Sequence, residues 1–291
     1  MREPLAAHMT ITDENVLIAG LRAMSPMVKL QHMVSLQQAA LTWLRAGIRR
    51  RQPEGDICSW RRAEAILRLG KAQAQLYMEA TISEDAVSDT YLSAIIQVIE
   101  TLDVLSIPYM LVGSLASTIH GEYRTTNDTD LVVLCTAHYA QPLVERLESS
   151  FLIRLPDVLD ALTQTRQFSA THLSTMFRID FFVRDSTPFA KMEFQRRQPV
   201  VIRENPPCTA WVATVEDTIL SKLRWYQLDS GVSDRQWRDI QTMVRVNEDM
   251  LDYTYLQQWG ADLQVTDPLD AALRGERPRP TDNDPQQTRM F

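Results

Sequence analysis

Cysteine is scarce in this sequence, and its few cysteines are far apart. Cys58, Cys135 and Cys208 are the only three in 291 residues, and no CxxC pair occurs. The five histidines also lack the short spacing of metal ligands. Disulfide frameworks and structural zinc sites depend on closely spaced cysteines and histidines. We therefore expect neither a disulfide scaffold nor zinc.

Long hydrophobic runs and an excess of positive charge are missing as well. A membrane-spanning helix needs about 20 apolar residues, and the longest apolar runs are far shorter. The first residues, MREPLAAHMT, contain no signal-peptide hydrophobic stretch, although Met9 is an alternative start. The net charge of −7 argues against a surface that binds nucleic acid throughout, but allows a local basic channel. We expect a soluble cytoplasmic protein that does not bind membranes.

What is present divides the chain into four regions. Residues 1–80 are expected to form a helical domain, because Ser25-Pro26 suits a helix start and the turn QPEGD at 52–56 separates two helical patterns. Ser59 is a candidate cap for the second helix of this hairpin. Residues 216–272 again show helical patterns, and the polar, proline-containing tail at 273–291 is predicted to be disordered.

Residues 81–215 mix helical and strand-like patterns. An amphipathic helix is predicted over 83–105, before Pro108. Four apolar runs of strand length follow, at 109–112, 130–135, 177–183 and 209–214. The expected fold class is therefore α+β, with a mixed-sheet core flanked by an N-terminal helical hairpin and C-terminal helices.

Two aspartates stand one residue apart where the second of these runs begins. In a strand, residues i and i+2 point to the same side, so Asp128 and Asp130 would present both carboxylates to one site. Two like charges so close are costly unless a cation neutralises them or one carboxylate takes up a proton. Mg²⁺ suits such oxygen ligands. The alternative is that both residues are polar turn or capping residues where a strand meets solvent.

A third acid, Asp180, lies inside the apolar run FRIDFFV. A buried carboxylate without a partner costs several kcal/mol, so Asp180 should lie near a cation or at the mouth of a site. Arg178 is at i−2 on the same face of the expected strand, and a structural salt bridge between the two is the alternative.

Gly113-Ser114 separates the run YMLV from the helical pattern SLASTIHG. A helix N-terminus offers backbone N–H groups and a positive dipole end, and glycine allows a phosphate to come close. The alternative is an ordinary strand-to-helix turn capped by Ser114. Together with the three acids, however, this turn predicts a two-metal site for phosphoryl transfer.

These residues resemble a known superfamily. GSLASTIHGEYRTTNDTDLVV followed by RIDFFV is similar to the nucleotidyltransferase superfamily of DNA polymerase β. HGxxRxTxDxDLV with EDTILSKLRWYQL and SDRQWRDI resembles, more narrowly, minimal bacterial nucleotidyltransferases of the AbiEii type from toxin–antitoxin and abortive-infection modules. The resemblance covers about residues 90–272, and Tyr123 departs from it where close relatives often have proline.

The resemblance implies roles for individual residues. Gly113 and Ser114 would contact the triphosphate of ATP or another NTP. Asp128 and Asp130 would bind Mg²⁺, and Asp180 would complete a two-metal site and help to activate the acceptor hydroxyl.

Three further residues have weaker assignments. Lys222 matches a lysine placed to reach phosphate, although a solvated helix lysine is an equal alternative. Arg124 and Thr126 lead into the paired aspartates, and Arg124 would either face phosphate or brace the loop. Asp234 and Asp239 are expected to cap and pair on their helix.

The expected function is Mg²⁺-dependent transfer of NMP from an NTP to a hydroxyl acceptor, with protein or tRNA favoured. One alternative is a catalytically silent, antitoxin-like protein that binds a nucleotide or a partner. The other is a small-molecule nucleotidyltransferase of the aminoglycoside type. Residues 1–80 also resemble a small helical protein that occurs beside such enzymes, and they are a candidate surface for a partner protein.

Overall fold

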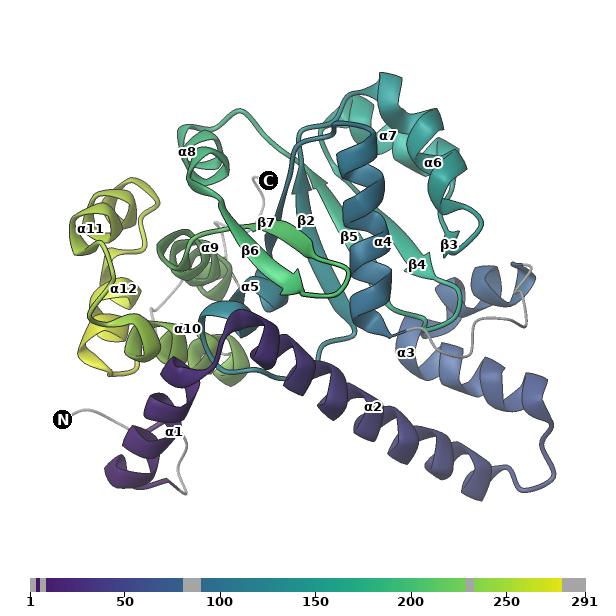
Figure 1. The fold of residues 1–291 in the computed structure, drawn as a ribbon, viewed down its shortest axis with the longest axis horizontal. Helices are drawn as coiled ribbons and strands as arrows, with labels where there is room; N and C mark the ends of the chain where they lie inside the picture. Colours follow the sequence, from purple (N-terminus) through teal and green to yellow (C-terminus); the bar gives the residue numbers. More distant parts are fainter. Residues whose placement is uncertain (1–3, 6–8, 81–89, 229–232, 279–291) are drawn as a thin grey trace. The chain divides into compact units, whose positions relative to one another are not determined.

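The computed structural model describes residues 4–5, 9–80, 90–228 and 233–278 and has a mixed α+β fold (Figure 1). Its contacts divide the chain into two compact units. One contains Pro26–Thr118 and Tyr123–Ala213, and the other contains Met1–Ser25, Ile119–Glu122 and Thr214–Phe291. This division differs from the one expected from sequence. The first 25 residues group with the C-terminal helices, and the rest of the N-terminal region groups with the sheet.

The larger unit, called here the sheet unit, is built on a seven-stranded sheet with the order β3-β4-β5-β2-β1-β7-β6. Strands β2 and β5 pair in parallel, as do β1 and β7, and the other neighbours are antiparallel. The strands are β1 (Tyr109–Val112), β2 (Asp128–Val133), β3 (Phe151–Leu152), β4 (Gln167–His172), β5 (Arg178–Val183), β6 (Gln198–Arg203) and β7 (Cys208–Val212). The four predicted strands are confirmed with small shifts at their ends, whereas β3, β4 and β6 were not predicted.

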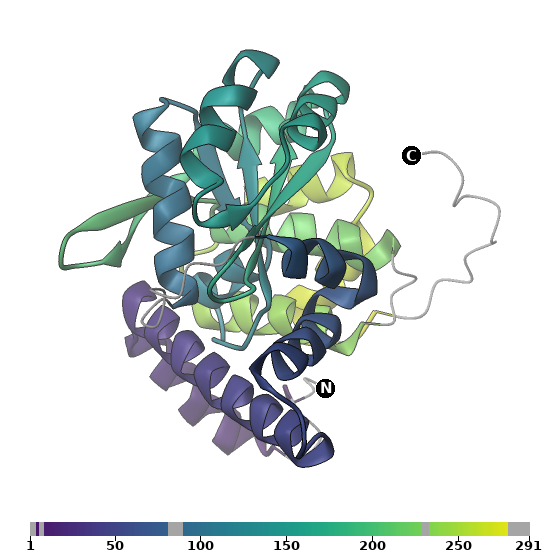
Figure 2. The same ribbon diagram turned by 90° about the vertical axis from the view of Figure 1, so that its right-hand side faces the viewer.

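Helix α4 (Tyr91–Val104) lies against one face of this sheet (Figures 1 and 2). Thr90 caps its N-terminus by accepting a hydrogen bond from the backbone N–H of Ser93. The amphipathic helix predicted over 83–105 is confirmed over Tyr91–Val104, and four of its apolar residues are fully buried: Ile95, Val98, Ile99 and Leu102. Residues 83–89 of that prediction lie outside the described residues. The unit also contains α5 (Gly113–His120, in part), η1 (Ala137–Tyr139), α6 (Ala140–Leu147), α7 (Leu155–Gln164) and α8 (Pro188–Arg196).

The predicted helical hairpin consists of α2 (Pro26–Arg51) and α3 (Ile57–Glu79). Helix α2 begins at Pro26 as expected. The prediction that Ser59 caps α3 is wrong. The cap is Asp56, whose carboxylate accepts a hydrogen bond from the backbone N–H of Ser59 at 2.8 Å, so the helix begins three residues earlier, at Ile57. Asp and Ser are both good caps, and the sequence alone did not distinguish them.

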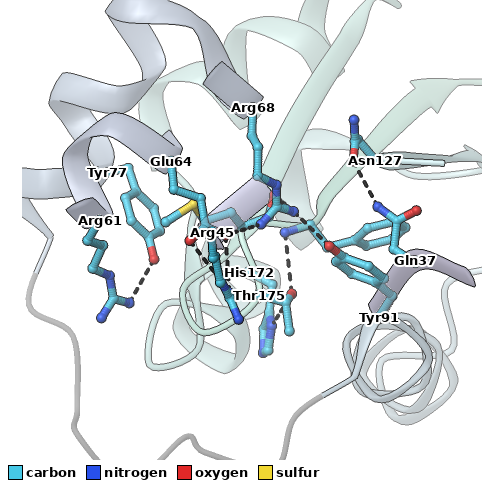
Figure 3. Close-up of polar contacts among 12 residues, drawn as sticks. Gln37, Arg45, Arg61, Glu64, Arg68, Tyr77, Tyr91, Asn127, His172 and Thr175 are labelled. Atoms are coloured by element: carbon cyan, nitrogen blue, oxygen red, sulfur yellow. Dashed lines mark hydrogen bonds and ion pairs between the residues drawn. The ribbon is translucent and has the colours of Figure 1, made fainter. Parts of the chain in front are cut away.

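Helix α3 is fixed to the turn between β4 and β5 by polar side chains (Figure 3). Arg61 and Tyr77 both donate hydrogen bonds to the carbonyl of Leu173, and Arg68 donates to the carbonyl of Met176 at 3.2 Å. Gly70 has φ 79°, a conformation that glycine adopts readily, and it kinks α3 between these anchors. The two halves of the helix therefore hold the same turn, which leads directly into β5.

Helix α2 is fixed to the segment that leads into β2. The side-chain amide of Gln37 donates to Asn127 Oδ1 at 2.9 Å (Figure 3). The His32 and Tyr123 rings stack with centroids 4.9 Å apart. The hairpin thus contacts the residues immediately before both β2 and β5.

The smaller unit, called here the terminal unit, joins α1 (Ile11–Ala23) to the C-terminal helices. Glu14 is fully buried and forms an ion pair with Arg245, while Arg22 donates to the carbonyl of Val246 at 3.0 Å. The C-terminal helices are α9 (Val215–Leu228), α10 (Asp234–Asn247), α11 (Tyr253–Asp262) and α12 (Thr266–Arg274). The predicted disordered tail at 273–291 begins too early, because residues 273 and 274 end α12. Residues 279–291 of this prediction lie outside the described residues.

No helix in the described part of the chain combines the length and apolar character needed to cross a bilayer.

Candidate functional site

The register of β2 and β5 gathers three predicted acids on one face of the sheet. The strands are parallel, and Asp130 lies opposite Asp180 while Asp128 lies opposite Arg178. Side chains that are opposite in a strand pair, or two apart along a strand, point to the same side. All four side chains therefore share one face, where three carboxylates face one guanidinium. The formal charge of this group is −2.

Arg178 bridges two of these acids. Its Nη2 atom lies 2.9 Å from Asp180 Oδ2 and 3.5 Å from Asp128 Oδ2. The Asp180 side chain is 9% exposed, whereas Arg178 and Asp128 are 45% and 42% exposed. The salt bridge that the sequence offered as the alternative for Asp180 is thus present, and it includes Asp128.

The second oxygen of Asp180 is held from the next strand. Ser169 on β4 lies opposite Asp180 and donates a hydrogen bond to Asp180 Oδ1 at 2.5 Å. Both oxygens of this carboxylate therefore have partners within the protein. Removing its charge is expected to cost stability, because losing the ion pair destabilises the fold more than relieving the like-charge repulsion stabilises it.

Asp128 is connected to the start of α5 through two hydroxyl groups. Thr126 Oγ1 lies 2.9 Å from Asp128 Oδ1, and Ser114 Oγ lies 3.1 Å from Thr126 Oγ1. Thr126 is buried, so its hydroxyl is fixed in place. These two hydrogen bonds place the N-terminus of α5 next to the first residue of β2.

Asp130 lies against Gly113, the first residue of α5. A Cβ atom added to Gly113 would lie 1.9 Å from Asp130 Oδ2, and Gly113 has φ +62°. Only glycine meets both conditions without strain. The carboxylate of Asp130 thus lies beside the helix N-terminus where a phosphate is expected to bind.

Gly113→Ala is expected to lower the free energy of unfolding by about 2–4 kcal/mol, from backbone strain and the clash with Asp130. Urea denaturation would measure this loss. Gly20→Ala is the control, because no atom beyond the neighbouring backbone of its own helix lies within 4 Å of its added Cβ, and this change should slightly increase stability. In the double variant Gly113→Ala/Asp130→Ala, the losses should be less than additive by about 1 kcal/mol or more. Additive losses would mean that the two residues do not contact each other.

The donor chemistry of this face fits a divalent cation. Carboxylate oxygens are preferred ligands of Mg²⁺, and the net charge of −2 favours a cation. Among the described residues, however, no three His, Cys, Asp or Glu side chains are close enough together to form a metal cluster. The guanidinium of Arg178 instead lies between two of the carboxylates. A metal ion would have to replace at least part of this ion pair.

The remaining predicted residues are placed elsewhere. Lys222 on α9 belongs to the terminal unit and lies 2.9 Å from Asp239 Oδ2 on α10. Asp239 thus pairs with a residue of another helix, and Asp234 pairs at 2.7 Å with Arg277, which also lies outside α10. The expectation that these aspartates pair is met, but not within their own helix, and the expectation that they cap it is wrong, because the cap of α10 is Ser233. Arg124 donates to the carbonyl of Thr125 at 3.3 Å, a local contact within the loop before β2.

Sequence reasoning missed two contributors to the site. Ser169 lies on a strand that was not predicted, although Phe168, Ala170 and His172 alternate as strand residues do. Gln37 contacts Asn127 from a helix 90 positions away in the chain. No local pattern could have indicated that contact.

Comparisons with known proteins find similar solved structures. No family model matches the chain, and no curated protein does. One similar solved structure is the crystal structure of an antigenic nucleotidyltransferase-like protein from Paracoccidioides brasiliensis. It is 19% identical, the match covers 70% of this chain and 100% of that chain, and the TM-score is 0.40. Similarity at this level does not establish a family.

Proposed function

We propose that this protein is a nucleotidyltransferase that moves NMP from an NTP to a hydroxyl acceptor. The observation that supports this most is the shared face of Asp128, Asp130 and Asp180, next to the glycine that begins α5. Three carboxylates beside a helix N-terminus suit a metal–triphosphate substrate. The carboxylates would bind the metal cation, and the helix N-terminus would bind the negatively charged phosphates.

In this proposal the triphosphate binds at the start of α5. The first backbone N–H groups of the helix and the Ser114 hydroxyl would donate to phosphate oxygens. Because the Asp130 carboxylate lies against Gly113, a cation held by Asp130 would also contact a phosphate bound there.

The reaction is a displacement at the α-phosphorus. The acceptor oxygen forms a bond to phosphorus, the bond to the leaving pyrophosphate breaks, and the acceptor proton passes to Asp180. Mg²⁺ held by Asp128, Asp130 and Asp180 would neutralise the phosphates and lower the pKa of the acceptor hydroxyl. The residues of the chain act by positioning and electrostatics, which are the main contributions in phosphoryl transfer.

We favour a protein or tRNA acceptor, and the charge of the α2–α3 hairpin supports tRNA. Pro26–Glu79 contains nine Lys and Arg and four Asp and Glu, a net charge of +5 in a chain whose net charge is −7. The rest of the chain has twenty-one basic and thirty-three acidic residues, a net charge of −12. A basic region suits a phosphate-rich acceptor. We place this activity in a toxin–antitoxin or phage-defence module, as the sequence resemblance implies.

The ion pairs of Arg178 favour a second candidate. Arg178 neutralises Asp128 and Asp180 without any metal ion. A catalytically silent protein would retain these ion pairs, because in such a protein the acids serve only to stabilise the fold. Such a protein would bind a nucleotide or a partner without turnover.

Label transfer separates the two candidates. The purified protein would be incubated with each α-labelled NTP, Mg²⁺ and cell extract, and the label followed into protein, RNA and low-mass fractions. Transfer that stops when EDTA replaces Mg²⁺ is the expected result. Label in the low-mass fraction would identify a small-molecule acceptor of the aminoglycoside type. Absence of transfer with every nucleotide and extract would contradict the enzyme and favour the silent protein.

A further inference from the structure

Arg178 lies where the proposed metal would have to bind. The same Nη2 atom contacts carboxylate oxygens of two different strands, Asp180 Oδ2 on β5 and Asp128 Oδ2 on β2. Each of these carboxylates has its other oxygen bonded to a hydroxyl, from Ser169 and Thr126. Arg178 is thus the cation that faces this pair of acids in the structure.

Burial and hydrogen bonding together indicate which of the three side chains can move, since Asp128, at 42% exposed, differs little from Arg178 in burial alone. Asp180 is nearly buried and is held from β4, and Asp128 is held by the buried Thr126. Arg178 is 45% exposed and has a long side chain. The carboxylates are therefore the fixed part of the ion pair, and the guanidinium is the part that can leave.

We propose that Arg178 is a counter-ion that the metal displaces and that then binds a phosphate of the incoming nucleotide. This inference rests on the proposed function. A metal ion arriving alone competes with a positive charge that is already in place, so its binding is weak. When metal and triphosphate arrive together, Arg178 exchanges two carboxylates for phosphate oxygens, which guanidinium groups bind well. Arg178 is then a positioning residue that makes metal and nucleotide binding depend on each other.

Coupling between two ligands is reciprocal. In the wild-type protein, the nucleotide should tighten Mg²⁺ binding, and Mg²⁺ should tighten nucleotide binding by the same factor. Without the guanidinium, Mg²⁺ has no competitor and the phosphate loses a partner. Metal affinity alone should rise, nucleotide affinity alone should fall, and the coupling should become smaller.

Calorimetric titration of the full chain tests this, with Mg²⁺ alone, with α,β-methylene ATP alone and with both. Arg178→Met is expected to bind Mg²⁺ alone about tenfold more tightly than wild type and the metal-free analogue about tenfold more weakly. These shifts follow from losing one close charge pair on a partly exposed face. Arg154→Met is the matched control, since Arg154 is an exposed arginine paired only with Asp157 at 3.7 Å among the contacts described, and it should match wild type.

Arg178→Gln repeats the test with a polar side chain if the methionine variant does not fold. Arg178→Lys keeps the positive charge and should restore weak binding of Mg²⁺ alone. If wild type binds both ligands and Arg178→Met has unchanged Mg²⁺ affinity, this inference is overturned and the proposed function is unaffected. If wild type binds neither ligand, the proposed function fails and the inference fails with it.

Discussion

Asp128→Asn and Asp130→Asn are each expected to lower nucleotidyl transfer by about 10³-fold or more. Each change removes one charged oxygen ligand from a site whose metal would contribute several kcal/mol to the transition state. The fold should survive, because both side chains are only partly buried and an amide oxygen can still accept the hydrogen bond from Thr126. Initial rates of label transfer at saturating Mg²⁺ would measure the loss.

Asp157→Asn is the matched control for these variants. Asp157 is an exposed aspartate of the sheet unit, on α7, and its carboxylate lies 3.7 Å from Arg154 Nε. Its activity should remain within about twofold of wild type, as expected for a surface substitution far from special features. Transfer that persists in both Asp128→Asn and Asp130→Asn would rule out this face as the catalytic site.

Glu64→Gln is expected to lower the free energy of unfolding by about 3–5 kcal/mol, the cost of breaking a buried ion pair on one side. Glu64 Oε1 lies 3.2 Å from Arg68, and Glu64 Oε2 lies 3.0 Å from Arg45 (Figure 3). The Arg68 side chain is 4% exposed, so its charge would stay buried after the change. Urea denaturation monitored by circular dichroism would measure the global loss.

The loss of stability in Glu64→Gln should also be detectable locally, in the turn before β5. Arg68 holds the Met176 carbonyl in the turn before β5, so amide hydrogen exchange should speed up at Met176 and Phe177. Glu79→Gln on the same helix is the control, because Glu79 is exposed and accepts only from Gln75 among the contacts described. It should change stability by no more than about 0.5 kcal/mol. Unchanged exchange in the turn of Glu64→Gln would show that α3 does not hold this turn.

The fold class and most of the core strands could be predicted because they depend on local patterns. The apolar run YMLV coincides with β1, and the alternation in β2 places Thr129 and Leu131 in the core and Asp128 and Asp130 on the other face. The candidate carboxylates also followed from spacing within strands. Their register could not be predicted, because the pairing of Asp130 with Asp180 depends on two strands meeting across about 50 residues of chain.

The roles of charged side chains were the least predictable part. Sequence placed Arg178 on the same face as Asp180, but its second contact, with Asp128, requires the strand pairing. Lys222 has a helical spacing that suits either solvent or phosphate, and its actual partner Asp239 comes from a neighbouring helix. The hairpin of α2 and α3 was expected to belong to a separate helical domain, because its sequence shows two helical patterns separated by a turn. Its contacts with the turn before β5 and the segment before β2 come from side chains whose partners are distant in the chain.

The terminal unit has a consequence for how the protein is made. Glu14 on α1 and Arg245 on α10 are 231 positions apart, yet they form one buried ion pair. During translation, α1 emerges from the ribosome early, whereas α10, which carries Arg245, is synthesised only after all residues of the sheet unit. The sheet unit can therefore fold while synthesis continues, as domains generally do, whereas the terminal unit must wait. A chain that stops before residue 245 would contain all the strands and carboxylates of the sheet unit, but α1 could not acquire its partner.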